Sequence, residues 1–128
     1  MMKSRTLSIS IARPAAQVYA FASKPENLPR WIRSARVRKS GDAWIMETPI
    51  GPIHIRVVAQ NEFGVLDHVA TLPDGQEVLN PIRVVPNGAG SEIVFTLFQT
   101  AGMSDQRFAE DAASVEADLR SLKGILER

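Results

Sequence analysis

The chain has 128 residues, a formal net charge of +1 and no cysteine. A chain of this length is typical of one domain, so we expect a single domain over residues 1–128. The missing cysteines exclude disulfides, thiolate metal sites and a thiol nucleophile. Residues 1–12 alternate polar and apolar side chains and contain no apolar core of a signal peptide, and no apolar run is long enough to span a bilayer. We therefore expect a cytoplasmic location.

The charges are unevenly distributed along the chain. Residues 1–40 contain nine Lys and Arg and one acidic residue, a net charge of +8. Residues 41–128 contain six Lys and Arg and thirteen acidic residues, a net charge of −7. Two explanations are open. The two parts attract each other across the fold, which we favour, or the first part forms a basic surface for an anionic partner.

The first third of the chain predicts a strand followed by helix. Apolar and polar side chains alternate over residues 7–12, as on a half-buried strand. Helical spacing of apolar residues predicts a short helix over 14–23, which Pro25 ends. Residues 27–31 predict a helical turn or loop in which Trp31 is the one large anchor.

The middle of the chain predicts strands. Turns rich in glycine, proline and asparagine separate six further segments of strand character, as in an antiparallel meander. These segments are 36–39, 43–47, 53–60, 65–72, 77–85 and 91–99. Pro81 interrupts one of them and predicts a bulge or an edge there, because proline has no amide hydrogen to donate.

The C-terminal segment predicts a long amphipathic helix. Apolar residues recur at spacings of four and three, a continuous stripe over about five turns. They are Phe108, Ala112, Val115, Leu119, Leu122 and Leu126. Ser104 is placed to cap the helix and Met103 to contact Phe108. We expect the charged residues of the segment, Asp118 among them, to lie mainly on the other faces. A helix of some 22–24 residues is roughly 35 Å long.

Four segments together resemble one known superfamily. They are 9–21, 25–31, 65–68 and 83–88, and the closing amphipathic helix adds to them. The chain resembles the SRPBCC superfamily, the START-like helix-grip fold shared with birch-pollen-type allergens and polyketide cyclases. The resemblance implies an α+β fold in which a seven-stranded curved antiparallel sheet wraps around the C-terminal helix, with two short helices after the first strand. It also implies a cavity whose commonest ligands are apolar.

The register of one predicted hairpin assigns side chains to the inner face of this sheet. A four-residue turn closed by Gln60 and Val65 pairs Val57 with His68, Ile55 with Ala70 and Ile53 with Leu72. This set is apolar except for His68, so we take it as the inner face. The opposite face then holds His54, Arg56, Asp67 and Thr71, with Arg56 and Asp67 placed diagonally for an ion pair.

The role of His68 is open on the sequence alone. An inward imidazole contacts a polar group of a ligand or moves a proton, or it is a core histidine bonded to a backbone carbonyl or a buried water. Arg83 is open as well, because the break at Pro81 hides its phase. If it faces inward it is a candidate for holding a carboxylate, and if it faces outward we expect it to pair with Glu92.

The candidate ligand-binding residues share the predicted inner face of the sheet or the apolar stripe of the helix, and Arg83 is included for the case in which it faces inward. They are Trp44, Met46, Ile55, His68, Arg83, Phe95, Leu97, Val115 and Leu119. Trp44 and Met46 share one phase of their strand, and both are also ordinary core residues. The first function we infer is binding of a small apolar or amphipathic ligand. The alternatives are a polyketide cyclase/dehydratase-like enzyme that uses His68 with Arg83, and a protein-interaction module.

Other chemistry has little support in the sequence. The two histidines are predicted on opposite faces, so we expect neither a metal site nor a cofactor. No nucleophile motif occurs. The basic segment 30–39 contains Trp31 as its only aromatic residue, and no nucleic-acid-binding motif occurs with it. We therefore expect a solvated surface there and no nucleic-acid partner.

Overall fold

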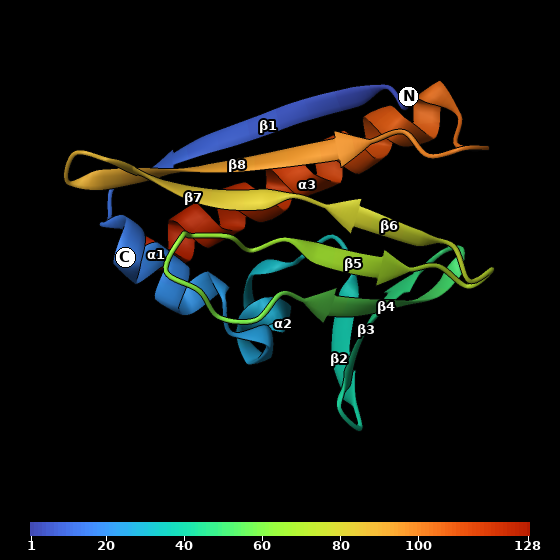
Figure 1. Ribbon diagram of the computed structural model, residues 1–128, viewed down its shortest axis with the longest axis horizontal. Helices are drawn as coiled ribbons and strands as arrows, with labels where there is room; N and C mark the ends of the chain where they lie inside the picture. Colours follow the sequence, from blue (N-terminus) through green and yellow to red (C-terminus); the bar gives the residue numbers. More distant parts are fainter.

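The computed structural model describes residues 1–128, with the eight strands and three α-helices labelled in Figure 1. The strands are β1 (Ser4–Ile11), β2 (Arg36–Ser40), β3 (Ala43–Thr48), β4 (Gly51–Val57), β5 (His68–Thr71), β6 (Glu77–Asn80), β7 (Ile82–Asn87) and β8 (Gly90–Phe98). The helices are α1 (Ala15–Ala22), α2 (Leu28–Trp31) and α3 (Asp105–Leu126), and a 3-10 turn (Pro25–Asn27) precedes α2. The α+β class, the two short helices after the first strand and the long last helix are as expected.

The strands pair in two antiparallel sheets rather than in the single seven-stranded sheet that the sequence predicts. One sheet has the order β1-β8-β7 and the other β2-β3-β4-β5-β6. The difference arises at Pro81, which splits the predicted strand 77–85 because it cannot donate to a ladder. Its carbonyl still accepts from the amide of Thr96 at 3.0 Å. The two sheets therefore meet at this residue.

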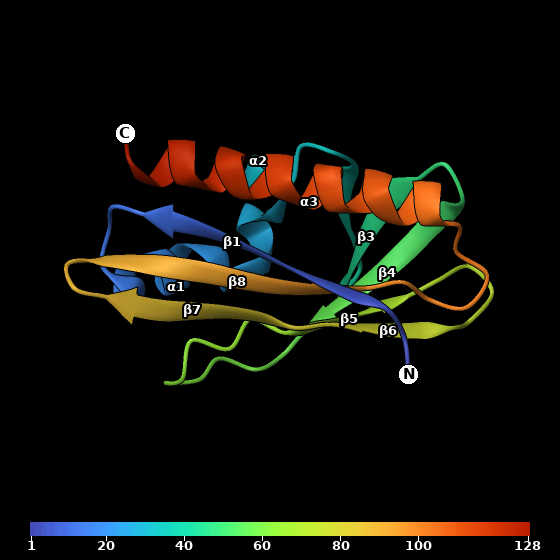
Figure 2. The same ribbon diagram turned by 90° about the horizontal axis from the view of Figure 1, so that it is seen from above.

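Helix α3 lies across one face of the sheets and packs against β1, β8 and α2. Strands β3 and β4 rise out of the plane of the other strands toward the first turns of α3 (Figure 2). The main core, eighteen contiguous buried residues, is formed by α1, α2 and α3 together with β1, β7 and β8 and includes Val37 of β2. None of the helices combines the length and apolar content that a membrane crossing needs.

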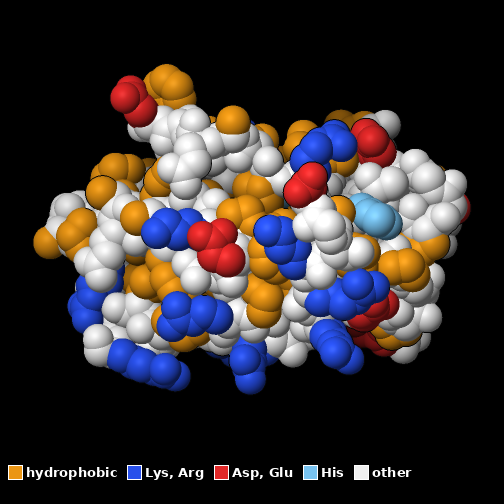
Figure 3. All heavy atoms as spheres, turned by 90° about the horizontal axis from the view of Figure 1, so that it is seen from below, with side chains coloured by type: hydrophobic (Ala, Val, Ile, Leu, Met, Phe, Trp, Pro, Cys, Tyr) orange, Lys and Arg blue, Asp and Glu red, His pale blue; other side chains and the backbone are white.

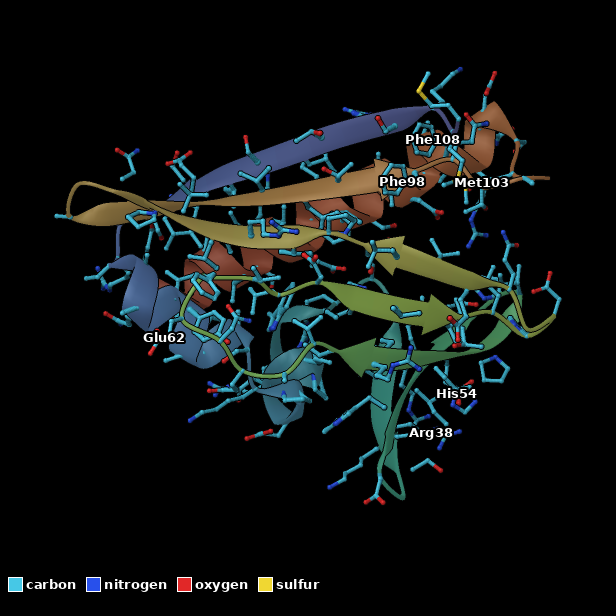
Figure 4. The ribbon with its side chains drawn as sticks, viewed as in Figure 1. Arg38, His54, Glu62, Phe98, Met103 and Phe108 are labelled. Atoms are coloured by element: carbon cyan, nitrogen blue, oxygen red, sulfur yellow. The ribbon has the colours of Figure 1, made fainter.

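The start of α3 is fixed as its sequence predicts. The Ser104 hydroxyl accepts from the amide of Arg107 at 3.1 Å, which satisfies one of the free amides of the first turn. Phe98, Met103 and Phe108 gather at this end of the molecule (Figure 4). Phe108 is buried, and Met103 packs against the same core, as the predicted apolar contact requires.

The connection between β4 and β5 is longer than predicted. The ladder continues to the amide of Val58, which donates to the Asp67 carbonyl at 3.0 Å, and the chain then leaves the sheet. Asn61 organises the loop, because its side chain accepts from the amides of Phe63 and Val65 at 2.9 and 3.1 Å. Gly64 follows with φ +71° close to the Val84 carbonyl, where a Cβ has no room. The predicted strands 53–60 and 65–72 are therefore shorter than expected.

Candidate ligand site

The inner face of the β4–β5 hairpin has the predicted register. Val57 pairs with His68 and Ile55 with Ala70. The prediction succeeded although the turn itself differs, because the loop preserves the alignment that a four-residue turn gives. Ile55 and Ala70 are buried, yet neither belongs to the contiguous core below α3. The concave side of this hairpin thus forms a separate apolar area.

His68 is the polar member of this face, and neither of its ring nitrogens has a hydrogen-bond partner. The imidazole lies at 6.2 Å from the ring of Phe95, measured between centroids, in an edge-to-face arrangement. Burial disfavours the imidazolium and lowers the pKa of His68 to about 4, although the negative charge of Asp67 acts in the opposite direction. The ring nitrogens are not fully enclosed either. The expected bond to a backbone carbonyl is therefore absent, and at neutral pH a neutral imidazole offers one donor and one acceptor.

Arg83 faces outward, away from this apolar area. Its guanidinium binds both carboxylate oxygens of Asp67, at 3.0 and 2.9 Å. The hydrogen bond from Arg83 holds the pKa of Asp67 below its usual range. Two expected ion pairs are accordingly wrong, because Asp67 pairs with Arg83 rather than with Arg56, and Glu92 accepts instead from Ser10 and Asn87. Arg83 cannot hold a ligand inside the fold in this conformation.

Trp44 and Met46 share a face of β3 with the inner residues of β4. Trp44 pairs with Ile55 and Met46 with Ile53, and both β3 side chains are half-buried against the core. The most buried residue of β3 is Ile45, on the opposite face. It pairs with Arg38 and His54, which lie beside it on the neighbouring strands (Figure 4).

The remaining candidates lie on β8 and α3. Phe95, Leu97 and Leu119 are buried in the core, and Val115 is half-buried against it. The apolar alternation of β8 and the stripe of α3 thus point inward as predicted. Whether these residues contact a ligand stays a prediction.

Asp118 is a buried polar residue, so the prediction that it lies on an outer face of the last helix is wrong. Only 8% of it is exposed, and its carboxylate accepts from the amides of Arg33 and Ser34 at 2.9 and 3.0 Å and from the Ser34 hydroxyl at 2.7 Å. Burial raises its pKa, and these bonds counteract part of the rise. Its spacing of three after Val115 and four before Leu122 places it within the apolar stripe, which is the signal that could have located it.

Trp31 carries a second unpartnered polar atom of the interior. The side chain is 7% exposed, and its indole Nε1 is buried without a hydrogen-bond partner. A buried donor left unpaired costs about 1–3 kcal/mol. The sequence predicted Trp31 as an anchor, which its burial confirms, but composition and spacing could not indicate a free donor.

Two hollows open on the flanks of α3. One, of about 350 Å³, lies along β1 and includes Leu119, and the other, of about 490 Å³, lies between α2 and α3. Neither includes His68, Trp44 or Met46, so the enclosed cavity expected from the sequence stays a prediction. No three His, Cys, Asp or Glu side chains cluster in a way that could hold a metal ion.

Comparison with protein families identifies the chain. Residues 2–127 match the model of the family described as "Polyketide cyclase / dehydrase and lipid transport". The chain belongs to this family. Membership places it in the SRPBCC superfamily, in agreement with the resemblance of its opening segments and closing helix. No curated protein matches the chain at a significant level.

Several solved structures share the fold of this member of the polyketide cyclase family. The Zhui aromatase/cyclase from Streptomyces sp. R1128 matches with a TM-score of 0.75 and 15% identity, over 100% of this chain and 95% of that one. The protein XoxI from Bacillus cereus matches with a TM-score of 0.74 and 17% identity, over 98% and 96%. Ara h 8.0201 matches with a TM-score of 0.71 and 14% identity, over 98% of each chain. At these identities the likeness establishes the helix-grip fold alone.

Proposed function

We propose that this protein binds a small apolar or amphipathic molecule between the concave face of β3–β5 and α3. The observation that carries the proposal is the separate apolar area around Ile55 and Ala70, which is buried without joining the main core. Such an area beside half-buried Trp44 and Met46 gives an apolar ligand a place to bind.

The polar part of the proposed ligand follows from the unpartnered imidazole of His68. His68 offers a donor and an acceptor on the inner face of β5. A ligand with a carbonyl or hydroxyl group would satisfy the imidazole, whereas a pure hydrocarbon would leave it unpaired. We therefore favour an amphipathic ligand over a hydrocarbon.

Binding of an uncharged, environment-sensitive dye such as Nile red tests the proposal. The native protein should increase the dye's fluorescence saturably, with one dye per chain. His68→Leu should change the affinity of the dye, because it replaces the polar group of the binding face. His54→Leu, on the outer face of β4, is the matched control and should leave the affinity unchanged. A fluorescence that rises linearly with dye and equally in all three proteins would refute the proposal.

A second function has a specific observation in its favour. The lowered pKa keeps the His68 imidazole neutral at neutral pH, and its nitrogens are free to move a proton. A cyclase/dehydratase activity would use this group without Arg83, which is engaged by Asp67. Conversion of a short poly-β-ketone, followed by absorbance, should then be lost in His68→Gln and retained in His54→Gln. Equal rates with and without protein would leave ligand binding as the better function.

A further inference from the structure

Most of the basic residues near the N-terminus have no acidic partner in the fold. Of the nine Lys and Arg within residues 1–40, only Lys3 and Arg38 form ion pairs, with Asp105 and Glu47. The other seven form no ion pair in the fold, so the attraction between the two oppositely charged parts stays a prediction. Basic side chains gather along the lower margin of the face seen in Figure 3.

Three of the chain's arginines line one hollow. The hollow between α2 and α3 has a volume of about 490 Å³ and includes no acidic residue in its lining. Its lining consists of Arg30, Arg33, Ser121, Gly124, Ile125 and Arg128. None of the three arginines forms an ion pair. Three like charges around one hollow repel each other, and an anion placed between them would remove that repulsion.

Contacts with the fold position the Arg30 guanidinium and the backbone of Arg33. The guanidinium carbon of Arg30 lies 5.0 Å from the centre of the Phe21 ring, in a cation–π contact that leaves its N–H groups free to donate. The backbone amide of Arg33 donates to Asp118 at 2.9 Å, which fixes the start of its side chain. The carboxylate of Asp118 accepts from Arg33 and Ser34 backbone amides and the Ser34 hydroxyl, so no ion pair with the hollow's arginines results.

Gly124 keeps this hollow open although helix packing does not require it. A Cβ at this position would meet no atom within 4 Å. A glycine inside a helix is less favourable than alanine by about 0.5–1 kcal/mol, so its presence here lacks a packing reason. Its missing side chain exposes the helix surface between the arginines.

We propose that the hollow between α2 and α3 binds a phosphate group. The planar guanidinium fork matches the geometry of phosphate oxygens and binds them through two parallel hydrogen bonds. A doubly charged phosphate also balances more of the positive charge than a carboxylate does. The group belongs either to a soluble phosphorylated molecule or to the headgroup of an anionic lipid, and it lies outside the proposed apolar site, so each site is tested independently.

Titration with inorganic phosphate, followed by the NMR shifts of arginine side-chain N–H groups and the Gly124 amide, tests the proposal. Binding should be saturable, and Arg30→Gln/Arg33→Gln should weaken it by about tenfold or more. The control Arg36→Gln/Lys39→Gln removes the same charge from exposed β2 positions outside the hollow and should change the affinity by less than about twofold. Equal weakening by both double variants, or no saturable binding, would overturn the proposal.

Two further arms identify the source of the phosphate and exclude an effect of net charge. Flotation with phosphatidylglycerol vesicles, compared with phosphatidylcholine vesicles, should succeed if the group is a lipid headgroup and fail if it is soluble. Gly124→Glu adds a carboxylate at the hollow, where the new Cβ meets no atom within 4 Å, and it should abolish phosphate binding while the helix content is retained. Binding that survives Gly124→Glu, or that is detected only for duplex DNA, would contradict a phosphate site here.

Discussion

At the scale of single residues, the sequence predicts which face of the sheet His68 occupies but not which face Arg83 occupies. His68 lies where the hairpin register places it, and its environment then sets its chemistry through burial and the absence of a partner. Arg83 follows a proline that breaks the alternation on which such a prediction depends. Only the fold shows that it turns outward to Asp67.

The lowered pKa of His68 makes the stability of the protein depend on pH. The unfolded chain takes up this proton near the ordinary value of 6.5, and the folded protein only near 4. Between these values the unfolded state holds more protons, so the free energy of unfolding should fall by up to about 3 kcal/mol as the pH decreases from 6.5 to 4. Urea denaturation at several pH values measures this change.

Two variants isolate the contribution of His68 to that pH dependence. His68→Gln should remove most of the fall in the free energy of unfolding that His68 causes between pH 6.5 and 4. His54→Gln should retain this fall. If the native protein and His68→Gln lose stability in parallel between pH 6.5 and 4, the imidazole is protonated in the folded state and its inferred environment is incorrect.

At the scale of elements, the sequence predicted what depends on local periodicity. The stripe of α3, the Ser104 cap and the β4–β5 register all follow from spacings within one or two segments. The long β4–β5 loop did not follow, because it depends on Asn61 bonding to several backbone groups at once. Asp118 was misplaced for a related reason, since its partners lie 84 and 85 residues away in the chain.

Helix α3 should contribute strongly to stability through its apolar stripe. Leu119 is 2% exposed, so Leu119→Ala removes packed methyl groups and should lower the free energy of unfolding by about 2–5 kcal/mol. Chemical denaturation measures the change. A loss below about half a kcal/mol would mean that the stripe is not packed in solution.

Asp118 should hold the segment after α2 against α3. Asp118→Asn keeps the shape of the side chain but replaces one accepting oxygen by a donor, which then faces donors, and we expect a loss of about 1–3 kcal/mol. The exposed Glu110→Gln on the same helix is the control and should change stability by less than about half a kcal/mol. Thermal denaturation measures the melting temperatures of both variants. Equal melting temperatures would show that the buried carboxylate does not stabilise this contact.

At the scale of the whole molecule, the main core and the proposed ligand site involve different strands. The three-stranded sheet, the helices and β2's Val37 form the main core, while the inner face of β4 and β5 lies outside it. The family and the related structures establish the helix-grip fold, and the resemblance of the opening segments already predicted it. The volume between β3–β5 and α3 could not be predicted, because it depends on how far the strands curve and which side chains fill the space.

The most direct test of ligand binding is the affinity of Nile red for Ala70→Phe compared with the native protein. Ala70 lies on the inner face beside Ile55, so a phenyl group there would occupy the space proposed for the ligand. We predict saturable binding by the native protein, a dissociation constant about tenfold or more higher in the variant, and nearly unchanged folding stability. Absence of binding in the native protein, together with a free energy of unfolding lower by about 1–3 kcal/mol in the variant, would mean that this face is a packed core and would contradict ligand binding there.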